Sequence, residues 1–198
     1  LPLFIMPFSN DPSYDDFGYA TLTASAYREG NSILEAAFEQ VLKTYFNWQG
    51  TYSAVFLFSL QPAIFGESFY ILSTFIMLGM LIGGTSLFIK TLLKDCLNLK
   101  SSNIIILICI LLFLSIQFVP SPVESFFWFN GSIFYTFFYS LMLFFFSCII
   151  KQLFVNSKKN LFSLILVPIL AVIIAGSNYV TSLLSIFFLR CITIYVTI

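Results

Sequence analysis

The sequence contains no histidine and little charge of either sign. Nine basic and nine acidic side chains make up only 9% of the 198 residues, and the formal net charge is zero. The lack of histidine excludes histidine-based acid–base catalysis, so any proton transfer falls to carboxylates, tyrosines or lysines. The neutral balance implies no nucleic-acid partner.

Paired cysteines are absent as well. Cys96, Cys109, Cys148 and Cys191 stand singly in or beside apolar runs, without the paired spacing of a metal site or a disulfide framework. We interpret them as small packing residues that face lipid or neighbouring helices.

Long apolar runs, by contrast, dominate the chain. Hydrophobic residues account for 59% of it and aromatic residues for 19%, and the mean hydropathy is +0.96, far above that of a soluble domain. Because a helix needs about 20 apolar residues to cross a bilayer, the candidate spans are residues 69–89, 103–119, 133–154, 161–175 and 183–198. The sequence therefore predicts an all-α fold, a polytopic transmembrane helical bundle of about five to six spans, with a kink at Pro168.

Both ends of the chain resemble interrupted helices. Residues 1–8 start without a methionine and are typical of the end of a span, and residues 183–198 stay apolar to the last position. We expect a fragment of a longer chain, organised as a single transmembrane domain over residues 1–198. In this reading residues 1–8 end a span, residues 9–66 form an outer loop, and residues 67–198 hold the remaining spans.

Lysines indicate the orientation. Lys90, Lys94 and Lys100 fall between the first two complete spans, and Lys151, Lys158 and Lys159 fall between the next two. The positive-inside rule places these loops in the cytoplasm, so residues 9–66, 120–132 and 176–182 face outward. Frequent Phe and Ile, with Lys preferred over Arg, are typical of an AT-rich bacterial genome. We expect a multi-pass protein of the bacterial cytoplasmic (inner) membrane.

The first outer loop is too long to be a simple connection. In residues 31–46 apolar side chains recur at helical spacing, with Glu35, Glu39 and Lys43 on the opposite side. This pattern predicts an amphipathic helix lying along the outer interface. Residues 53–65 are apolar but too short to cross alone, and they fit either a re-entrant or interfacial segment or the start of a helix pair.

Two adjacent aspartates, Asp15 and Asp16, follow the first apolar stub. Neighbouring carboxylates at a membrane surface repel, which raises one pKa or invites a divalent cation such as Mg²⁺ or Mn²⁺. Either outcome suits acid–base or metal-assisted chemistry, so both aspartates are candidate catalytic and metal-binding residues. The alternative is a solvated loop in which an aspartate caps a helix that starts near Phe17.

Polar and aromatic residues gather in all three predicted outer segments. Aromatic side chains at this depth commonly form an interfacial belt, yet an aromatic face beside a carboxylate also suits a sugar ring. Asn130-Gly131 is expected to turn the chain sharply into the next span. Because several loops on one face can build one site, the candidate substrate-binding residues are Trp48, Glu124, Trp128, Asn130 and Asn178.

Arg190 interrupts the last apolar run. An unpaired charge within a span is costly and commonly marks a functional position, and the phosphate of a lipid-linked substrate is one partner for it. Arg190 is therefore a further candidate for substrate binding. The alternatives are that its side chain snorkels toward the interface or that residues 183–198 do not form a span.

Together these motifs resemble the GT-C superfamily of membrane glycosyltransferases. The resemblance rests on Tyr14-Asp15-Asp16-Phe17-Gly18-Tyr19-Ala20 after a first span and on Tyr45-Phe46-Asn47-Trp48-Gln49-Gly50-Thr51-Tyr52 after an interfacial helix. Glu124, Trp128, Gly131 and Ser132 match a Glu-x-x-x-Trp-x-x-Gly-Ser pattern of poorly characterised bacterial multi-spanning proteins. Thr51 departs from the family, which has a basic residue after the Trp-x-Gly stretch.

The resemblance implies many transmembrane helices, catalysis at the outer face, and transfer of a sugar from a polyprenyl-phosphate-linked donor to an envelope glycan, lipid or protein. In such enzymes an acidic residue of the first outer loop serves as general base or helps bind a metal, a role that would map onto Asp15 or Asp16. Three alternatives stay open: a transporter or flippase of lipid-linked glycans, a glycan polymerase, and a non-catalytic membrane subunit.

Overall fold

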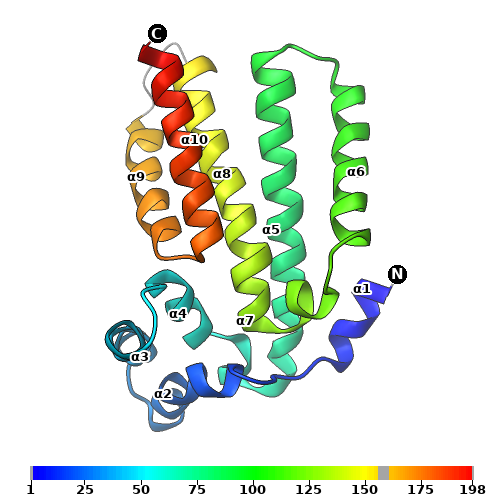
Figure 1. The fold of residues 1–198 in the computed structure, drawn as a ribbon. Coiled ribbons are helices and arrows are strands. Elements are labelled where there is room, and N and C mark those ends of the chain that lie inside the picture. Colours follow the sequence, from blue (N-terminus) through cyan, green and yellow to red (C-terminus); the bar gives the residue numbers. More distant parts are fainter. Residues whose placement is uncertain (1, 156–160, 198) are drawn as a thin grey trace.

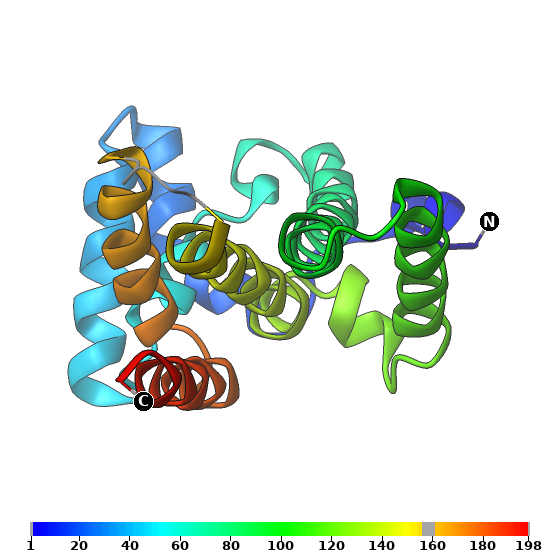
Figure 2. The same cartoon turned by 90° about the horizontal axis from the view of Figure 1, so that it is seen from above.

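The computed structural model describes residues 2–155 and 161–197, and every regular element in this part of the chain is a helix. Figure 1 shows a bundle of long helices and, at one end of it, shorter helices that run across the bundle direction. We call the second group the transverse cap, which consists of α2 (Asp16–Glu29), α3 (Ile33–Asn47) and α4 (Tyr52–Ser59). In Figure 2 these blue to cyan helices lie in the plane of the view, whereas α5 and α8 are seen close to end-on.

Within the described residues, the bundle contains α5 (Ile71–Lys90), α6 (Ser101–Gln117), α8 (Phe138–Ile150), α9 (Leu161–Ala175) and α10 (Tyr179–Thr197). Short helical turns extend α5 and α8 at both ends without a break: η3 (Glu67–Tyr70), η4 (Thr91–Cys96), α7 (Phe129–Ser132), η6 (Ile133–Phe137) and η7 (Lys151–Val155).

Three of the described helical stretches are long and apolar enough to cross a membrane: Glu67–Cys96, Phe129–Val155 and Tyr179–Thr197. They coincide with the apolar runs predicted at residues 69–89, 133–154 and 183–198, although Ile198 lies outside the described residues. The runs at 103–119 and 161–175 form the shorter apolar helices α6 and α9, and Pro168 lies inside α9.

The bundle core forms where α5 and α8 touch. A Cβ added at Gly84 on α5 would lie 2.8 Å from the backbone oxygen of Ser140 on α8, so only glycine permits this approach. Farther along α8, the ring of Phe146 stacks on that of Phe188 in α10, with centroids 3.8 Å apart. Close helix contact through small residues is the usual packing of membrane helices.

The transverse cap is attached to the bundle at the turn between α9 and α10. The Gly176 carbonyl accepts hydrogen bonds from the backbone N–H groups of Ser53 and Ala54, at 2.9 and 3.2 Å. The Tyr52 hydroxyl donates to the Val172 carbonyl at 2.5 Å. The first turn of α4, whose N–H groups have no partner within the helix, is therefore held by the bundle.

The amphipathic helix predicted at residues 31–46 corresponds to α3. The Ser32 side chain accepts a hydrogen bond from the Glu35 N–H at 3.3 Å and so caps its start. The helix buries Ala37, Gln40 and Thr44 against the rest of the cap. It exposes large apolar side chains along a neighbouring stripe: Leu34, Phe38, Leu42, Tyr45 and Phe46.

Residues 53–65 form α4 and the turn η2 (Pro62–Phe65). Ala54, Val55 and Phe58 are buried in the main apolar cluster, which also contains Tyr70 at the start of the α5 stretch. This segment therefore belongs to the cap and does not pair with α5 along the bundle (Figure 1).

The expectation that Asn130-Gly131 turns the chain sharply is wrong. Both residues lie inside α7, the first turn of the Phe129–Val155 helix, and they are preceded by the π-helical turn η5 (Val123–Phe127). The change of direction occurs at Trp128, whose backbone is extended with φ −80° and ψ 115°.

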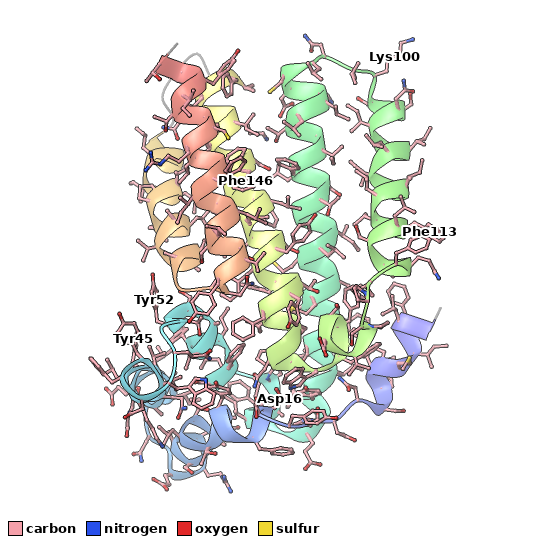
Figure 3. All side chains as sticks on the ribbon, in the orientation of Figure 1. Asp16, Tyr45, Tyr52, Lys100, Phe113 and Phe146 are labelled. Atoms are coloured by element: carbon pink, nitrogen blue, oxygen red, sulfur yellow. The ribbon has the colours of Figure 1, made fainter. Side chains whose placement is uncertain are left out.

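The two ends of the molecule differ in charge. Figure 3 shows Lys100 at the far end of the bundle and Asp16 at the end that carries the transverse cap. The ion pair between Lys151 and Asp95, 3.5 Å apart, joins η7 to η4 at the Lys100 end. Apart from Asp95, which pairs with Lys151, the aspartates lie at the other end of the molecule, so the lysines near the long helices gather away from Asp11, Asp15 and Asp16. The short turns α1 (Pro2–Ile5) and η1 (Met6–Ser9) lead into the Asp16 end.

Candidate functional site

Part of the predicted site forms a pocket between the transverse cap and the start of the Phe129–Val155 helix. Its volume is about 410 Å³, within the range of roughly 300 to 1,000 Å³ usual for ligand sites. The residues that line it are Asp15, Gly18, Tyr19, Gln40, Trp48, Gln49, Phe58, Trp128, Asn130 and Phe134. We call it the Asp15 pocket. It brings together four of the predicted residues: Asp15, Trp48, Trp128 and Asn130.

A tight turn presents Asp15 to this pocket. Tyr14 has a φ of +51°, in the left-handed region that residues with a side chain rarely adopt. Asp15 then occupies the N-cap position of α2, as the capping alternative predicts, but its side chain makes no capping hydrogen bond. The carboxylate is exposed. It is therefore available to a ligand in the pocket.

On the opposite wall, Trp128 and Asn130 carry polar atoms that have no hydrogen-bond partner within the described residues. Asn130 is only 3% exposed, and neither its Oδ1 nor its Nδ2 is bonded; the Trp128 Nε1 is likewise buried and unpaired. A buried polar group without a partner costs about 1–3 kcal/mol, so a ligand or bound water commonly completes it. A polar ligand or a water that reached these atoms would supply the missing hydrogen bonds.

The Glu-x-x-x-Trp-x-x-Gly-Ser pattern has a local structural reason. The Trp128 N–H donates to the Val123 carbonyl at 2.7 Å, and the Ser132 N–H donates to the Trp128 carbonyl at 2.8 Å. A Cβ at Gly131 would lie 2.7 Å from Cε3 of Trp128 and 2.8 Å from the Glu124 carbonyl oxygen. Glycine therefore allows the indole to lie close against the first turn of α7.

Replacement of Gly131 by alanine is expected to displace the Trp128 ring and to destabilise the fold by about 1–3 kcal/mol, as overpacking commonly does. The measurements are the tryptophan emission maximum and the thermal unfolding midpoint. Gly79→Ala is the matched control, because a Cβ there meets nothing within 4 Å. An unchanged emission maximum in Gly131→Ala would contradict this account of the motif.

Three further residues of the pocket escaped the sequence analysis. Gln49 donates from Nε2 to the Tyr19 hydroxyl at 3.3 Å, and Gln40 donates to the Thr44 hydroxyl at the same distance. Burial raises the pKa of Tyr19, and the nearby charge of Asp15 acts in the same direction, so its phenol keeps its proton at neutral pH. The sequence could have indicated Gln40, because Gln40 and Thr44 are polar residues on the otherwise apolar face of a predicted amphipathic helix.

Asp16, by contrast, lies behind the pocket wall and is fully buried. Its Oδ2 accepts hydrogen bonds from the Tyr70 hydroxyl at 2.5 Å and the Ser13 N–H at 3.2 Å, and its Oδ1 accepts one from the Asn130 N–H at 3.2 Å. The Tyr70 hydroxyl in turn accepts the Phe129 N–H at 2.9 Å. Asp16 therefore joins α2 to the starts of the α5 and α7 helices. This placement indicates a structural role rather than the predicted catalytic one.

Burial raises the pKa of the Asp16 carboxyl, and the charge of Asp15 adds to this effect; hydrogen bonds from Tyr70, Ser13 and Asn130 oppose it. The sequence-based expectation of one raised pKa in the pair thus falls on Asp16, chiefly through loss of hydration.

The expected divalent cation fits the aspartate pair poorly. Both Asp16 oxygens already accept hydrogen bonds, which leaves Asp15 as the one accessible carboxylate of the pair. No group of three or more His, Cys, Asp or Glu side chains able to hold a metal ion occurs within residues 2–155 and 161–197. A cation here would need most of its oxygen ligands from a substrate.

Asn178 lines a second pocket, of about 540 Å³, that adjoins the first. The two share Gln49 and Phe134 in their walls. The Asn178 side chain donates to the Phe134 carbonyl and accepts the Thr181 N–H at 2.8 Å, so it caps α10. The other walls are largely apolar or aromatic: Tyr135, Tyr139, Met142, Val180 and Leu184. We call this space the Asn178 pocket.

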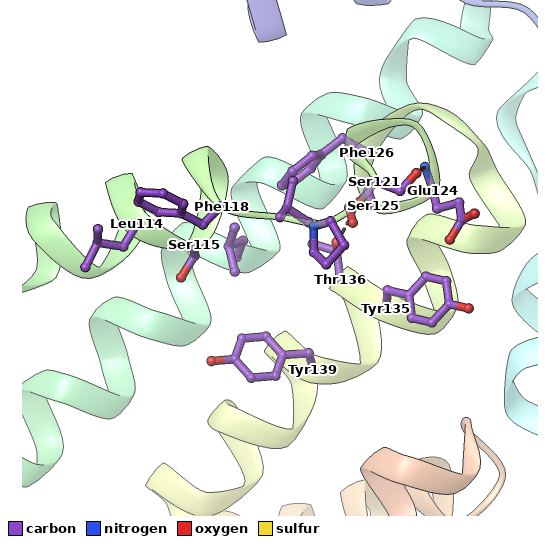
Figure 4. A pocket seen from close by; sticks show the side chains of 13 residues that line it. Leu114, Ser115, Phe118, Ser121, Glu124, Ser125, Phe126, Tyr135, Thr136 and Tyr139 are labelled. Carbon is purple, nitrogen blue, oxygen red and sulfur yellow. Dashed lines mark hydrogen bonds between the residues drawn. The ribbon is translucent and has the colours of Figure 1, made fainter.

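Glu124 lies apart from the Asp15 pocket, in a third pocket of about 570 Å³ between α6, η5 and α8. Figure 4 shows Glu124 among the side chains that line this pocket, with Tyr135 and Tyr139 along one side. Because these two tyrosines also line the Asn178 pocket, the three pockets follow one another around the start of α8. Glu124 can meet an extended ligand, but not one confined to the Asp15 pocket.

Arg190 is not part of this arrangement. It is exposed on α10, eleven residues beyond Tyr179, which is about 16 Å along a helix. It lines none of the three pockets described above. Its predicted role in substrate binding stays a prediction.

Comparison of the chain with protein-family models, with curated proteins and with solved structures gives no match in any of the three. The functional argument therefore rests on the geometry of the Asp15 pocket and on the motifs that form it.

Proposed function

We propose that the chain forms the site of a membrane glycosyltransferase, which moves a sugar from a polyprenyl-phosphate-linked donor to an envelope glycan, lipid or protein. One observation carries the proposal. The Asp15 pocket combines an accessible carboxylate, two indole rings and the amide side chains of Gln40, Gln49 and Asn130.

This combination suits a sugar. The faces of Trp48 and Trp128 offer apolar surface for the C–H face of a pyranose, whereas amides and phenols exchange hydrogen bonds with its hydroxyls. The unpaired Oδ1 and Nδ2 of Asn130 and the Nε1 of Trp128 provide acceptor and donors for such hydroxyls. A site built on buried hydrogen bonds discriminates strongly against ligands that lack the matching groups.

The adjoining Asn178 pocket supports a lipid-linked donor. Its largely apolar walls continue from Phe134, which also lines the Asp15 pocket. A ligand with a polar sugar and an apolar tail would place each part in a matching environment. The GT-C resemblance implies a donor of this kind.

In the proposed reaction Asp15 accepts the proton of the acceptor hydroxyl. The hydroxyl oxygen forms a bond to the anomeric carbon, the bond from that carbon to the phosphate oxygen breaks, and the polyprenyl phosphate leaves with the electron pair. Configuration at the anomeric carbon is inverted. Because phosphate is a good leaving group, a strong general acid is not required, which is compatible with a chain that lacks histidine.

The proposed setting is the bacterial cytoplasmic (inner) membrane, with α6 and α9 spanning it alongside the three longer helices. The lysines at the end of the bundle marked by Lys100 favour a cytoplasmic position for that end, so the Asp15 pocket faces outward. The exposed apolar stripe of α3 and its direction across the bundle support an interfacial position for this helix.

A transporter or flippase of lipid-linked glycans has less support, because α5 and α8 are in backbone contact at Gly84 and Ser140 and leave no space between them at that level. A glycan polymerase would use the same chemistry at the Asp15 pocket. A non-catalytic subunit would leave the orphaned atoms of Asn130 and Trp128 unexplained.

The proposal is tested with purified protein and a set of undecaprenyl-phosphate hexoses. We expect one of them to change the tryptophan emission and to release its sugar to an acceptor or to water. Because the donor set for a cation is poor, release is expected to persist in excess EDTA. Binding without release would favour a transporter, and no binding of any hexose would refute the proposed donor. Loss of release in EDTA, restored by Mg²⁺ or Mn²⁺, would refute the metal-independent step.

A further inference from the structure

A separate cleft runs along the side of α2 that faces away from the Asp15 pocket. Its volume is about 610 Å³. Residues of α2 at helical spacing form one wall: Phe17, Ala20, Thr21, Ala24 and Arg28; η2, η3 and the segment before α2 form the rest. We call it the Arg28 cleft. None of its lining residues lines the Asp15 pocket.

The charged groups of the cleft have no ionic partner in the part of the chain that the structure describes. Arg28, Asp11 and Glu67 all line it and are exposed, yet the ion pair found within residues 2–155 and 161–197 joins Lys151 to Asp95 elsewhere. The Arg28 Nε donates to the Ala24 carbonyl at 3.1 Å. This bond turns the guanidinium back along α2 toward the cleft and leaves its terminal nitrogens for a ligand.

Gln61 provides a second sign that the cleft binds a ligand. It is 2% exposed and lines the cleft. Its Nε2 donates to the Asp16 carbonyl at 2.7 Å, but its Oε1 has no partner among the described residues. A buried amide oxygen normally accepts a hydrogen bond, and a ligand hydroxyl in the cleft would supply one after a small side-chain movement.

The separation of the charges indicates an elongated ligand. Phe17 and Arg28 are eleven residues apart on α2, or about 16 Å along the helix. The basic group lies toward the C-terminal part of α2, whereas Asp11 and Pro12 lie at its start, next to the turn that presents Asp15. A ligand that extends along the cleft therefore ends near the N-terminus of α2, where Asp15 lines the Asp15 pocket on the other side of the helix.

We infer that the Arg28 cleft binds the acceptor as an anionic oligosaccharide, with its carboxylate or phosphate on Arg28 and its hydroxyls on Asp11, Glu67 and the Gln61 Oε1. Guanidinium groups bind both anions through paired hydrogen bonds. Carboxylates and an amide oxygen accept from sugar hydroxyls. The term acceptor rests on the proposed function, whereas the binding site does not depend on it.

The test uses calorimetric titration of the purified protein with trigalacturonate and with maltotriose 1-phosphate, which distinguish a carboxylate from a phosphate. The neutral counterparts are the methyl ester of trigalacturonate and maltotriose. We expect at least one anionic compound to bind. The affinity for its neutral counterpart should be lower by about tenfold or more. Added salt is expected to weaken the binding of the anionic compound but not that of its neutral counterpart.

Two variants test whether the anionic compound binds in the Arg28 cleft. Arg28→Gln is expected to reduce the affinity for the anionic compound about tenfold, and Lys43→Gln, which removes an exposed cation of α3, is expected to leave it unchanged. The two tryptophans of the chain both line the Asp15 pocket, so binding in the Arg28 cleft should release heat with little change in tryptophan emission. Equal affinity in Arg28→Gln and wild type, or no binding of either anionic compound, would overturn the inference.

The outcomes separate this inference from the proposed function. Binding of an anionic oligosaccharide, combined with no response to any undecaprenyl-phosphate hexose, would support the cleft and refute the proposed donor. Sugar release from the donor without oligosaccharide binding would support the proposed donor and refute the Arg28 cleft as a binding site.

Discussion

Replacement of Asp15 by asparagine is expected to lower sugar transfer by about 10²- to 10⁴-fold, the usual contribution of a general base. Asparagine has the same shape but cannot accept the proton of the acceptor hydroxyl. Because the Asp15 side chain makes no capping hydrogen bond, the fold should not change. The measurement is the rate of sugar release at saturating donor, together with the thermal unfolding midpoint.

Glu35→Gln provides the matched control for Asp15→Asn. It neutralises another exposed carboxylate of the transverse cap, on α3, that lies outside the Asp15 pocket and the Arg28 cleft. Its transfer rate should equal that of the wild type. If Asp15→Asn retains full activity with an intact fold, Asp15 is not the general base, and the proposed mechanism is wrong.

Asp16→Asn and Tyr70→Phe are expected to reduce the free energy of unfolding rather than to act on the chemistry directly. In Asp16→Asn, an amide N–H₂ would face the Tyr70 hydroxyl and the Ser13 N–H, both of which donate to Oδ2 in the native protein. In Tyr70→Phe, the Phe129 N–H loses its acceptor. Hydrogen bonds to a charged group contribute about 1.5–3 kcal/mol, and each variant should lose an amount in this range.

Unfolding by heat or denaturant in detergent measures this loss, with Tyr195→Phe as the control, because Tyr195 is exposed on α10. Wild-type stability in either Asp16→Asn or Tyr70→Phe would contradict the structural role assigned to Asp16.

The same hydrogen bonds around Asp16 predict that the stability of the fold depends on pH. Because the pKa of Asp16 is raised above its ordinary value of 3.8, the folded protein holds this proton more tightly than the unfolded chain does. Its contribution to stability is present in full below pH 3.8 and is lost as pH rises through the folded-state pKa, by up to about 1.4 kcal/mol per pH unit. Asp16→Asn should lack this component, so its stability relative to wild type should improve with increasing pH within that window. A constant difference would indicate that Asp16 does not titrate there.

Hydropathy was sufficient to predict the long helices, because uninterrupted apolar runs leave few alternatives to a helix in a bilayer. The sequence also predicted that the polar and aromatic segments lie at one end of the bundle, and Asp15, Trp48, Trp128 and Asn130 meet there. The number of spans, the orientation and the transfer reaction stay predictions.

The different roles of Asp15 and Asp16 could not be predicted. Adjacent residues at the start of a helix point about 100° apart, so one can face a pocket while the other faces the core. What decides between them is Tyr70 and Asn130, which lie 54 and 114 positions from Asp16. No local pattern reveals partners at that distance.

Glu124 illustrates a second limit. It lies four positions before Trp128, and a regular helix would place both on one face. The chain instead passes from the π-helical turn η5 into an extended residue at Trp128. This break separates the two side chains into different pockets.

The bonds that Asp16 makes also set the order in which the molecule can be completed. The chain is synthesised from its N-terminus, so Asp16 exists long before Tyr70 and longer still before Asn130, and loop closure over such lengths is slow. Until residues 127–130 have been made, the Asn10 side chain also lacks the Phe127 carbonyl to which it donates at 2.7 Å. The Asp15 pocket is therefore a late product of biogenesis, which forms only after the helix that begins at Phe129 has joined the bundle.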